Sequence, residues 1–379
     1  MVDIVILNGK VITFDGQDAQ ALAIKGDTIE AVGATEDIRS IAGDAQVIDA
    51  AGATVMPGFI DSHVHLFGGS AELDCVNLAG EGGEQAIAQA IQNHPHKAAG
   101  NEVMLAASLD YHAFGERDIT RHDLDAVAPD IPFAAIAADH HTVWANTRAL
   151  EMAGLINGAT VPEGSEVVMG GDGLASGELR ETGAFGPVLA LTAYGGRDLA
   201  GYVSGKDPQP AATAEQRARD KAVIARGLQH CASYGITGLH NMDGNFYQLE
   251  LLAELLDEGN LLCRTEVPMH LKGSDPLDRL QEAQAMRQQY QSDYLWCRRV
   301  KMFMDGVIDS RTAYMLNPYP GTNSGSEALF TPDQFNEACI TADAMQLQIA
   351  VHAIGDAAVR QTLDGYQAAQ QINGIRDSR

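Results

Sequence analysis

The sequence is poor in cysteine, in positive charge and in long apolar runs, and each shortage excludes a class of protein. Its five cysteines, among 379 residues, stand singly and form no Cys-x-x-Cys pair. A disulfide framework is therefore not expected, and the pattern indicates reduced thiols in the cytoplasm. No Gly-x-Ser-x-Gly segment occurs either, which disfavours a serine hydrolase of the nucleophile-elbow type.

No apolar run approaches the roughly 18 residues that a membrane-spanning helix needs. The start, MVDIVILNGKVITFDG, lacks the basic segment and long apolar core of a secretory signal. Acidic residues outnumber basic ones by 51 to 25, for a formal net charge of -26. Such a surface repels phosphate backbones and anionic membranes, so neither nucleic acid nor a membrane is expected as a partner. The oligomeric state is not readable, and a homo-oligomer is left open.

What the sequence does contain is a change of pattern near residue 57. Residues 1–56 hold short segments rich in Val and Ile that end at Gly or Asp, which predicts the strands of a small β-sandwich or sheet. From residue 57 onward, strands alternate with amphipathic helices, which indicates a parallel sheet or barrel over 57–379. Strands are expected at 57–65, 235–243, 263–271, 299–306 and 347–356, and helices at 214–233, 246–258, 277–291 and from Asp333, with Thr331 as N-cap and Pro332 in the first turn.

Residues 67–212 do not fit a simple barrel repeat and are interpreted as a large insertion after the first barrel strand. The insertion contains two expected strands, VMLAASL and FAAIAAD, an expected helix near 146–153, and the glycine-rich stretch VVMGGDGLASGELRETG. Segments inserted at the carboxyl ends of barrel strands commonly shape substrate access.

His63 and His65 are the first candidates for chemistry. Side chains alternate along a strand, so these two imidazoles point the same way at the end of the expected strand 57–65. Imidazole suits Zn, Fe, Ni or Mn at neutral pH. His-x-His alone is a weak signal, because histidine is often only structural. The preceding segment PGFID strengthens it.

His352 and Lys301 lie at comparable positions in two later strands. His352 ends an apolar strand before a Gly-Asp turn, where it is either a satisfied core histidine or a neighbour of the first pair. Lys301 lies in the apolar segment VKMFM, and a buried ammonium is usually paired or neutralised. Neutralisation by CO2 gives a carbamate that can bind metal, whereas the simpler alternative is an ion pair with a carboxylate such as Asp305.

Five segments of this sequence together resemble one known family. They are, in chain order, PGFIDSHVHL, DHHTVWANTRALEMAGL, SGELRE, VKMFMDGVIDSRTA and VHAIGDAAV. In this order they resemble the amidohydrolase superfamily, in the branch that includes N-substituted formamide deformylases and exoenzyme regulatory proteins. The resemblance runs from the amino-terminal strands to the last residue.

The resemblance implies a (β/α)8 TIM-type barrel beside a small β-sandwich, with one or two divalent ions, zinc being the expected metal. It implies that His63 and His65 are metal ligands on the first barrel strand. Lys301 then carries a CO2-derived carbamate on the fourth strand, and His352 is the ligand on the fifth. Lys301 and His352 are also the expected catalytic residues.

The resemblance also suggests a substrate-side role for the segment that contains His141 and Trp144. For His141 a hydrogen bond that orders a loop is an equal alternative. Glu178 and Arg311 are weaker candidates for substrate binding, because exposed charges are more often only solvated.

The sequence departs from the family pattern at its end. In the family, a histidine on strand six and an aspartate on strand eight follow, but the chain ends at GIRDSR before either. Five strands cannot close a barrel, so we expect this to be part of a longer protein whose C-terminal strands are missing here. The strand-eight aspartate, the family's proton shuttle, cannot be named.

The predicted function is hydrolysis of an amide or other non-peptide C–N bond of a small molecule by a metal-activated hydroxide. Two alternatives stay open: a non-catalytic regulatory or binding protein on the same fold, and a lactone or ester hydrolase. The sequence reveals neither the substrate nor the identity and number of the metals.

Overall fold

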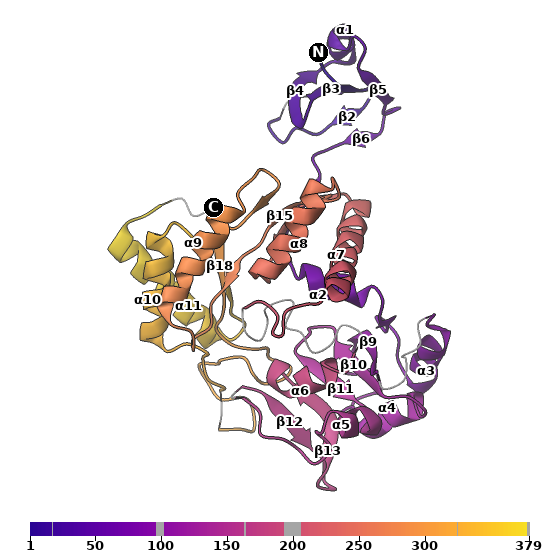
Figure 1. Ribbon diagram of the computed structural model, residues 1–379, viewed down its shortest axis with the longest axis vertical. Coiled ribbons are helices and arrows are strands. Elements are labelled where there is room, and N and C mark those ends of the chain that lie inside the picture. Colours follow the sequence, from indigo (N-terminus) through magenta and orange to yellow (C-terminus); the bar gives the residue numbers. More distant parts are fainter. Residues whose placement is uncertain (17, 96–101, 163, 193–205, 324, 377–379) are drawn as a thin grey trace. The chain divides into compact units, whose positions relative to one another are not determined.

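The computed structural model describes residues 1–16, 18–95, 102–162, 164–192, 206–323 and 325–376. The chain forms two compact units (Figure 1). The first contains Met1–Ile60 with Gly235–Thr237, and the second contains Asp61–Tyr234 with Gly238–Arg379. The segment predicted as an insertion therefore belongs to the same unit as the later strands. In the described ranges, no helix has the length and apolarity needed to cross a bilayer.

The first unit is built on a four-stranded sheet of order β4-β3-β1-β5 (Figure 1). Its strands are β1 (Ile4–Leu7), β3 (Ala21–Lys25), β4 (Thr28–Gly33) and β5 (Gln46–Asp49), and the short strands β2 (Lys10–Val11) and β6 (Thr54–Val55) pair with each other. Helix α1 (Thr35–Ile41) covers one face of the sheet, where Ile38 packs against Val5 and Ala23. The predicted strands are confirmed, but α1 was missed because seven residues with a single deeply buried isoleucine give no clear helical period.

The predicted insertion forms a six-stranded mixed sheet of order β12-β13-β11-β10-β9-β8. Its strands are β8 (Val76–Asn77), β9 (Met104–Leu109), β10 (Phe133–Ala137), β11 (Thr142–Ala145), β12 (Glu166–Met169) and β13 (Ala175–Arg180). Helices α3 (Glu84–Asn93) and α4 (Arg121–Val127) pack on one face, and α5 (Thr147–Met152) and α6 (Thr182–Leu189) pack on the other. The insertion is thus a layered α/β structure with its own core and not a set of loops.

The central strand β10 shows why this sheet is buried on both sides. Its residues alternate between the two faces, so Phe133, Ala135 and Ala137 pack with α3 and α4. Ala134 and Ile136 pack with α5 and α6 on the opposite face. An uninterrupted apolar segment is typical of a strand covered on both faces.

The remaining strands follow one another in chain order across two sheets, β17-β15-β14-β7 and β16-β18-β19. Every predicted strand is present, but the one expected at 263–271 is divided, and a short strand, β17 (Leu295–Trp296), was not expected. The predicted strands appear as β7 (Phe59–Val64), β14 (Ile236–Asn241), β15 (Arg264–Glu266) with β16 (Met269–His270), β18 (Arg299–Phe303) and β19 (Gln348–His352). The β14–β15, β15–β17, β16–β18 and β18–β19 pairs are parallel. Parallel strands in sequence order agree with the predicted barrel, whose closure stays a prediction.

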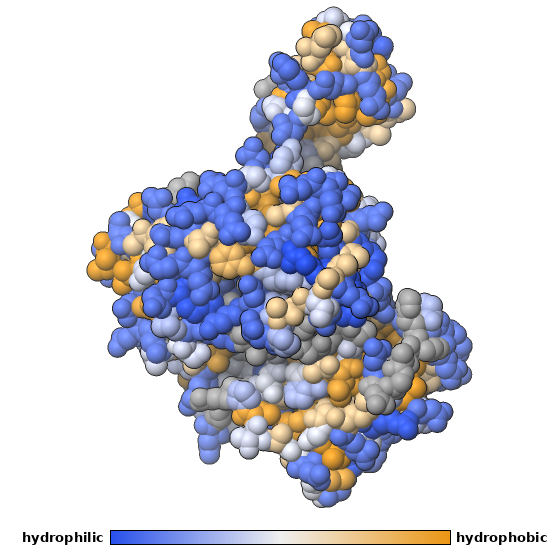
Figure 2. All heavy atoms as spheres, viewed as in Figure 1, coloured by the Kyte–Doolittle hydropathy of each residue, from blue (hydrophilic) through white to orange (hydrophobic). Residues whose placement is uncertain are grey.

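Helices connect these strands as predicted (Figure 1). They are α2 (Leu66–Glu72), α7 (Ala214–Ser233), α8 (Phe246–Asp257), α9 (Leu280–Gln289), α10 (Pro332–Ala344) and α11 (Asp356–Asn373). Helix α10 begins with the predicted cap, because the Thr331 hydroxyl accepts a hydrogen bond from the amide of Gln334 and Pro332 is in the first turn. The face drawn in Figure 2 is mainly hydrophilic with scattered apolar groups, which agrees with amphipathic helices that turn their polar sides to solvent.

Candidate metal centre

The predicted ligands His63 and His65 lie at the carboxyl end of β7. Their ring centroids are 5.5 Å apart and their planes make an angle of 60°, as expected for residues two apart on a strand. Desolvation lowers the pKa of His63, and the positive charge of Lys301 lowers it further. His63 is therefore a neutral imidazole near pH 7, the form that can bind a metal ion.

A buried carboxylate that the sequence reasoning missed holds His65. The Asp243 side chain is 1% exposed, and its oxygen atom Oδ2 lies 2.8 Å from Nδ1 of His65. A carboxylate only accepts hydrogen bonds, so Nδ1 carries the proton and Nε2 keeps its lone pair. This arrangement is typical of a histidine prepared as a metal ligand. The available signal was the place of Asp243 at the end of the predicted strand 235–243.

Lys301 lies within β18 and is 1% exposed. Its Nζ atom is 4.6 Å from the centroid of the Phe303 ring, and among the described residues it makes no hydrogen bond or ion pair. Burial lowers the pKa of Lys301 to about 8; the nearby Arg299 guanidinium acts in the same direction, and the Asp243 carboxylate opposes both. The amine is thus far closer to its neutral, reactive form than an exposed lysine would be.

Asp305 is not the partner of Lys301, so the pairing expected for it is wrong. The buried Asp305 carboxylate accepts three backbone hydrogen bonds, from the amides of Tyr314 and Gly355 at 2.8 Å and of Ile354 at 3.0 Å. It thereby joins the loop after β18 to the turn after β19. The three bonds meet the hydrogen-bonding requirement of the buried Asp305 carboxylate, and they fix the backbone next to His352.

His352 ends β19 and lies opposite Phe303 of β18. Its Nε2 atom is 3.0 Å from the carbonyl oxygen of Gly306. Because a carbonyl only accepts, Nε2 carries the proton and Nδ1 keeps its lone pair. Burial lowers the pKa of His352, and the hydrogen bond to the Gly306 carbonyl opposes this effect. Burial thus favours a neutral imidazole, the form that can bind a metal ion.

A polar network surrounds Arg299, two residues before Lys301 on the same side of β18. Its guanidinium is 2.9 Å from the carboxylate of Glu266, and it is 2.8 Å from Nδ1 of His240 and from the side-chain oxygen of Gln348. The network links β14, β15, β18 and β19. His240 is therefore part of the polar network that surrounds Arg299, two residues from Lys301.

The insertion brings His141 to this group. The His141 and His352 ring centroids are 5.2 Å apart, which places His141 beside the predicted ligands, as expected for a substrate-side residue. Nδ1 of His141 lies 2.9 Å from the carboxylate of Glu181, which the sequence reasoning missed. Glu181 is the last residue of the segment SGELRE, but nothing in that segment indicated that it would contact a residue forty positions earlier.

The three other predicted substrate contacts have different surroundings. Trp144 is 1% exposed and packs in the core of the insertion against Tyr111, so its position supports a packing role and not substrate contact. Glu178 is buried and forms an ion pair with Arg180 at 2.7 Å, so the expectation of a merely solvated charge is wrong. Arg311 is exposed in the loop after β18, with a φ angle of 59°.

The donor chemistry of His63, His65, Lys301 and His352 fits a divalent ion, because each imidazole has a nitrogen lone pair and Lys301 is buried with a lowered pKa. In the described part of the chain, however, no three His, Cys, Asp or Glu side chains are gathered closely enough to hold one. The four residues therefore have donor atoms suited to a divalent ion, and one of the four is a lysine.

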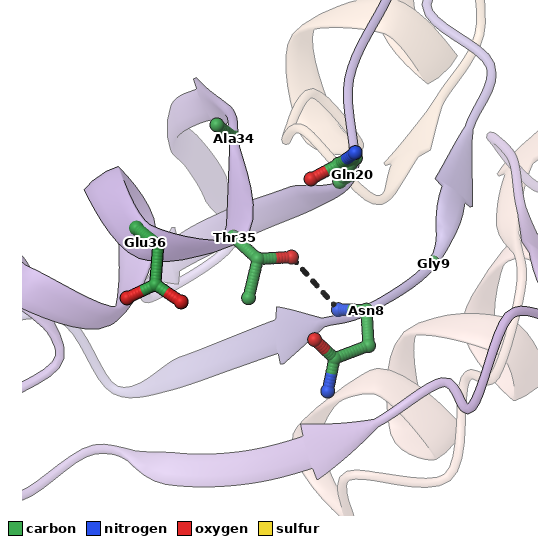
Figure 3. A pocket seen from close by; sticks show the side chains of 6 residues that line it. All are labelled: Asn8, Gly9, Gln20, Ala34, Thr35 and Glu36. Carbon is green, nitrogen blue, oxygen red and sulfur yellow. Dashed lines mark hydrogen bonds between the residues drawn. The ribbon is translucent and has the colours of Figure 1, made fainter.

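A hollow in the first unit contains none of these residues (Figure 3). It is lined by Asn8, Gly9, Gln20, Ala34, Thr35 and Glu36, and the Thr35 hydroxyl accepts a hydrogen bond from the backbone amide of Asn8 at 3.2 Å. It has no group of nucleophilic or metal-binding side chains, so the chemistry is assigned to the strand ends of the second unit.

Residues 46–379 match the model of the amidohydrolase family. The chain belongs to this family. It is 26% identical over 393 residues to the N-substituted formamide deformylase of Arthrobacter pascens, a match that covers 98% of this chain and 67% of that protein. It is also 26% identical over 389 residues to LONG AFTER FAR-RED 3 of Arabidopsis thaliana, covering 100% of this chain and 63% of that protein. The family resemblance stated from the sequence is thus confirmed.

The fold is also similar to solved structures. A metal-dependent hydrolase of Pyrococcus horikoshii superposes with a TM-score of 0.65 at 23% identity, covering 96% of this chain and 68% of that one. At this identity the likeness concerns the fold alone. The chain spans about two thirds of the length of the curated relatives that it matches.

Proposed function

We propose that this chain carries the metal site of a hydrolase that cleaves an amide or other non-peptide C–N bond in a small molecule. The observation that carries the proposal is the Lys301 side chain, which is buried, for which the described residues show no hydrogen bond or ion pair, and which lies in a strand next to the one that ends at His352. Membership of the amidohydrolase family supports the reaction class. The name of the Arthrobacter pascens relative, an N-substituted formamide deformylase, favours formamide-like substrates.

The lowered pKa of Lys301 supports its conversion into a carbamate. With a pKa of about 8, roughly one tenth of the amine is neutral at pH 7, against roughly one in 3,000 for an exposed lysine. The neutral amine attacks CO2, a C–N bond forms, one proton leaves, and the cation becomes an anionic oxygen ligand. The cationic Arg299 favours the anionic product, whereas the nearby Asp243 carboxylate opposes it.

The ion would be held by His63, His65, the Lys301 carbamate and His352. When bound, it would supply Lewis acidity that polarises the scissile carbonyl and makes water more acidic. The chain's own groups prepare the ligands for this task. Asp243 holds the Nδ1 proton of His65, and the carbonyl of Gly306 holds the Nε2 proton of His352, so the opposite nitrogens keep their lone pairs.

The test combines metal analysis with a substrate screen. The purified chain, loaded with zinc, manganese or iron, is assayed against N-formyl and N-acyl amines, lactones and esters. We expect His63→Ala to lose bound metal and C–N hydrolysis together, whereas His122→Ala, which changes an exposed histidine on α4, keeps both. Full metal occupancy with unchanged turnover in His63→Ala would refute the ligand assignment.

A separate measurement tests whether Lys301 carries a carbamate. With 13C-labelled bicarbonate, a carbamate carbon signal is expected in the wild-type chain and is expected to vanish in Lys301→Met. Metal binding without turnover of any substrate would favour the non-catalytic alternative. Turnover confined to lactones or esters would favour the second alternative, a lactone or ester hydrolase.

A further inference from the structure

Glu181 connects three parts of the second unit. It lies between β13 and α6, and its two carboxylate oxygens receive separate hydrogen bonds. Nδ1 of His141 donates to Oε2 at 2.9 Å, and the Thr312 hydroxyl donates to Oε1 at 2.6 Å. His141 precedes β11, whereas Thr312 belongs to the loop after β18. The carboxylate therefore joins the insertion to the loop beside the candidate metal ligands.

Close packing holds the carboxylate in this place. A Cβ atom added to Gly306 would lie 2.5 Å from Oε1 of Glu181 and 2.1 Å from the Thr312 hydroxyl oxygen, both far below contact distance. Only glycine lets the backbone approach so closely. The carbonyl of the same Gly306 accepts the Nε2 proton of His352. The turn at Gly306 thus lies against the hydrogen-bond partners of both His141 and His352.

The two hydrogen bonds determine which nitrogen of each ring carries the proton. Because the Glu181 carboxylate only accepts, Nδ1 of His141 carries a proton, and in the neutral ring Nε2 is the unprotonated nitrogen. His352 carries its proton on Nε2. The two rings are 5.2 Å apart between centroids, tilted by 44°. Among the described residues, no side chain or backbone group donates to Nε2 of His141.

We propose that Glu181 is a positioning residue that fixes His141 with its proton on Nδ1, so that Nε2 accepts a hydrogen bond from an N–H group of the substrate beside His352. The ligand class, an amide or amine N–H donor, rests on the proposed function. The position of the Nδ1 proton does not, because it follows from the Glu181 contact alone.

The first test reads the ring directly by long-range 1H–15N NMR of the 15N-histidine-labelled chain. The chain has 12 histidines, so the His141 signals are assigned by their loss in His141→Asn. We expect the Nδ1-protonated form in the wild-type chain and in Glu181→Gln, whose amide oxygen can still accept. In Glu181→Leu we expect a mixture of both tautomers. Glu166→Gln, an exposed acid on β12 of the same sheet, is the matched control and should change nothing.

An Nε2-protonated His141 in the wild-type chain would overturn the proposal even if Glu181→Leu failed to fold. An unchanged tautomer in a folded Glu181→Leu would overturn it as well.

The second test uses kinetics with a substrate found in the screen. Loss of one substrate hydrogen bond of about 1.4 kcal/mol corresponds to a tenfold change. We therefore expect Glu181→Leu and His141→Asn to raise KM about tenfold with kcat changed less than threefold, while Glu181→Gln stays within threefold of wild type in both. A fall in kcat at unchanged KM would overturn the substrate-binding role. The expected tautomers without turnover of any substrate would count against the proposed function and leave the positioning of His141 supported.

Discussion

Replacing Asp305 by alanine should loosen the backbone on both sides of His352. The Asp305 carboxylate is 2% exposed and accepts hydrogen bonds from the amides of Tyr314, Ile354 and Gly355. A hydrogen bond to a charged group is worth about 1.5–3 kcal/mol, so three give at most about 4.5–9 kcal/mol. The bonds share one acceptor and are not additive, and the freed amides gain access to water. We expect a local cost of about 3–4 kcal/mol.

Hydrogen exchange followed by mass spectrometry measures this cost locally, without assuming that a protein of two units unfolds in one step. A cost of about 3–4 kcal/mol predicts exchange roughly 100- to 1,000-fold faster in peptides covering 312–316 and 352–357. Asp305→Asn keeps one acceptor oxygen and should show a smaller effect, about 10- to 50-fold.

The matched control is Asp333→Asn, an exposed acid in the first turn of α10. Its interaction with the helix amino terminus is worth less than about 1 kcal/mol, and exchange near His352 should stay within threefold of wild type. Wild-type exchange at 312–316 and 352–357 in Asp305→Ala would refute the reasoning, because the three bonds would then contribute nothing.

Two further predictions concern stability away from the candidate site. Gly227→Ala should destabilise the contact between α2 and α7 by at least about 1–3 kcal/mol, because its Cβ atom would lie 1.7 Å from the Ser70 hydroxyl oxygen. Gly69→Ala in α2 is the control: its Cβ atom meets no neighbour, so it should be neutral or slightly stabilising. Thermal melts of the two variants measure the difference. Hydrogen bonding from Arg117 lowers the pKa of Asp123 to about 2 from 3.8, so its charged form stabilises the start of α4 above about pH 4, and this contribution is lost as the pH falls toward 2. Asp123→Ala should therefore cost about 1–2 kcal/mol of stability at pH 6, a value reduced because the Arg117 guanidinium is exposed. Hydrogen exchange of α4 should show this difference from wild type shrinking toward about pH 2.5. A difference that stays constant with pH would contradict the prediction.

Local patterns in the sequence were sufficient for most strands and helices. The cap at Thr331 with Pro332 is chemistry within a few residues, and the structure has it where the sequence predicts it. The His63-x-His65 pair could be recognised for the same reason, since strand geometry alone puts both side chains on one side. Family membership, stated from five short segments, is confirmed by the family match over residues 46–379.

Contacts between distant segments could not be read in this way. Asp243 meets His65 across 178 positions, and Glu181 meets Thr312 across 131. No local period encodes which acidic residue ends beside which histidine. Trp144 shows the opposite error, because its place in a distinctive motif suggested substrate contact while the sheet buries it in the core.

The sequence by itself determined most strand and helix types and the family, and it pointed to His63, His65, Lys301 and His352 as candidate ligands, because periodicity and short motifs are local properties. Only the tertiary structure decided that Lys301 is buried beside Phe303 without the expected Asp305 partner, and which nitrogen of each histidine keeps its lone pair. Burial and hydrogen-bond partners depend on which elements pack together, and these two properties determine the protonation and reactivity of the site.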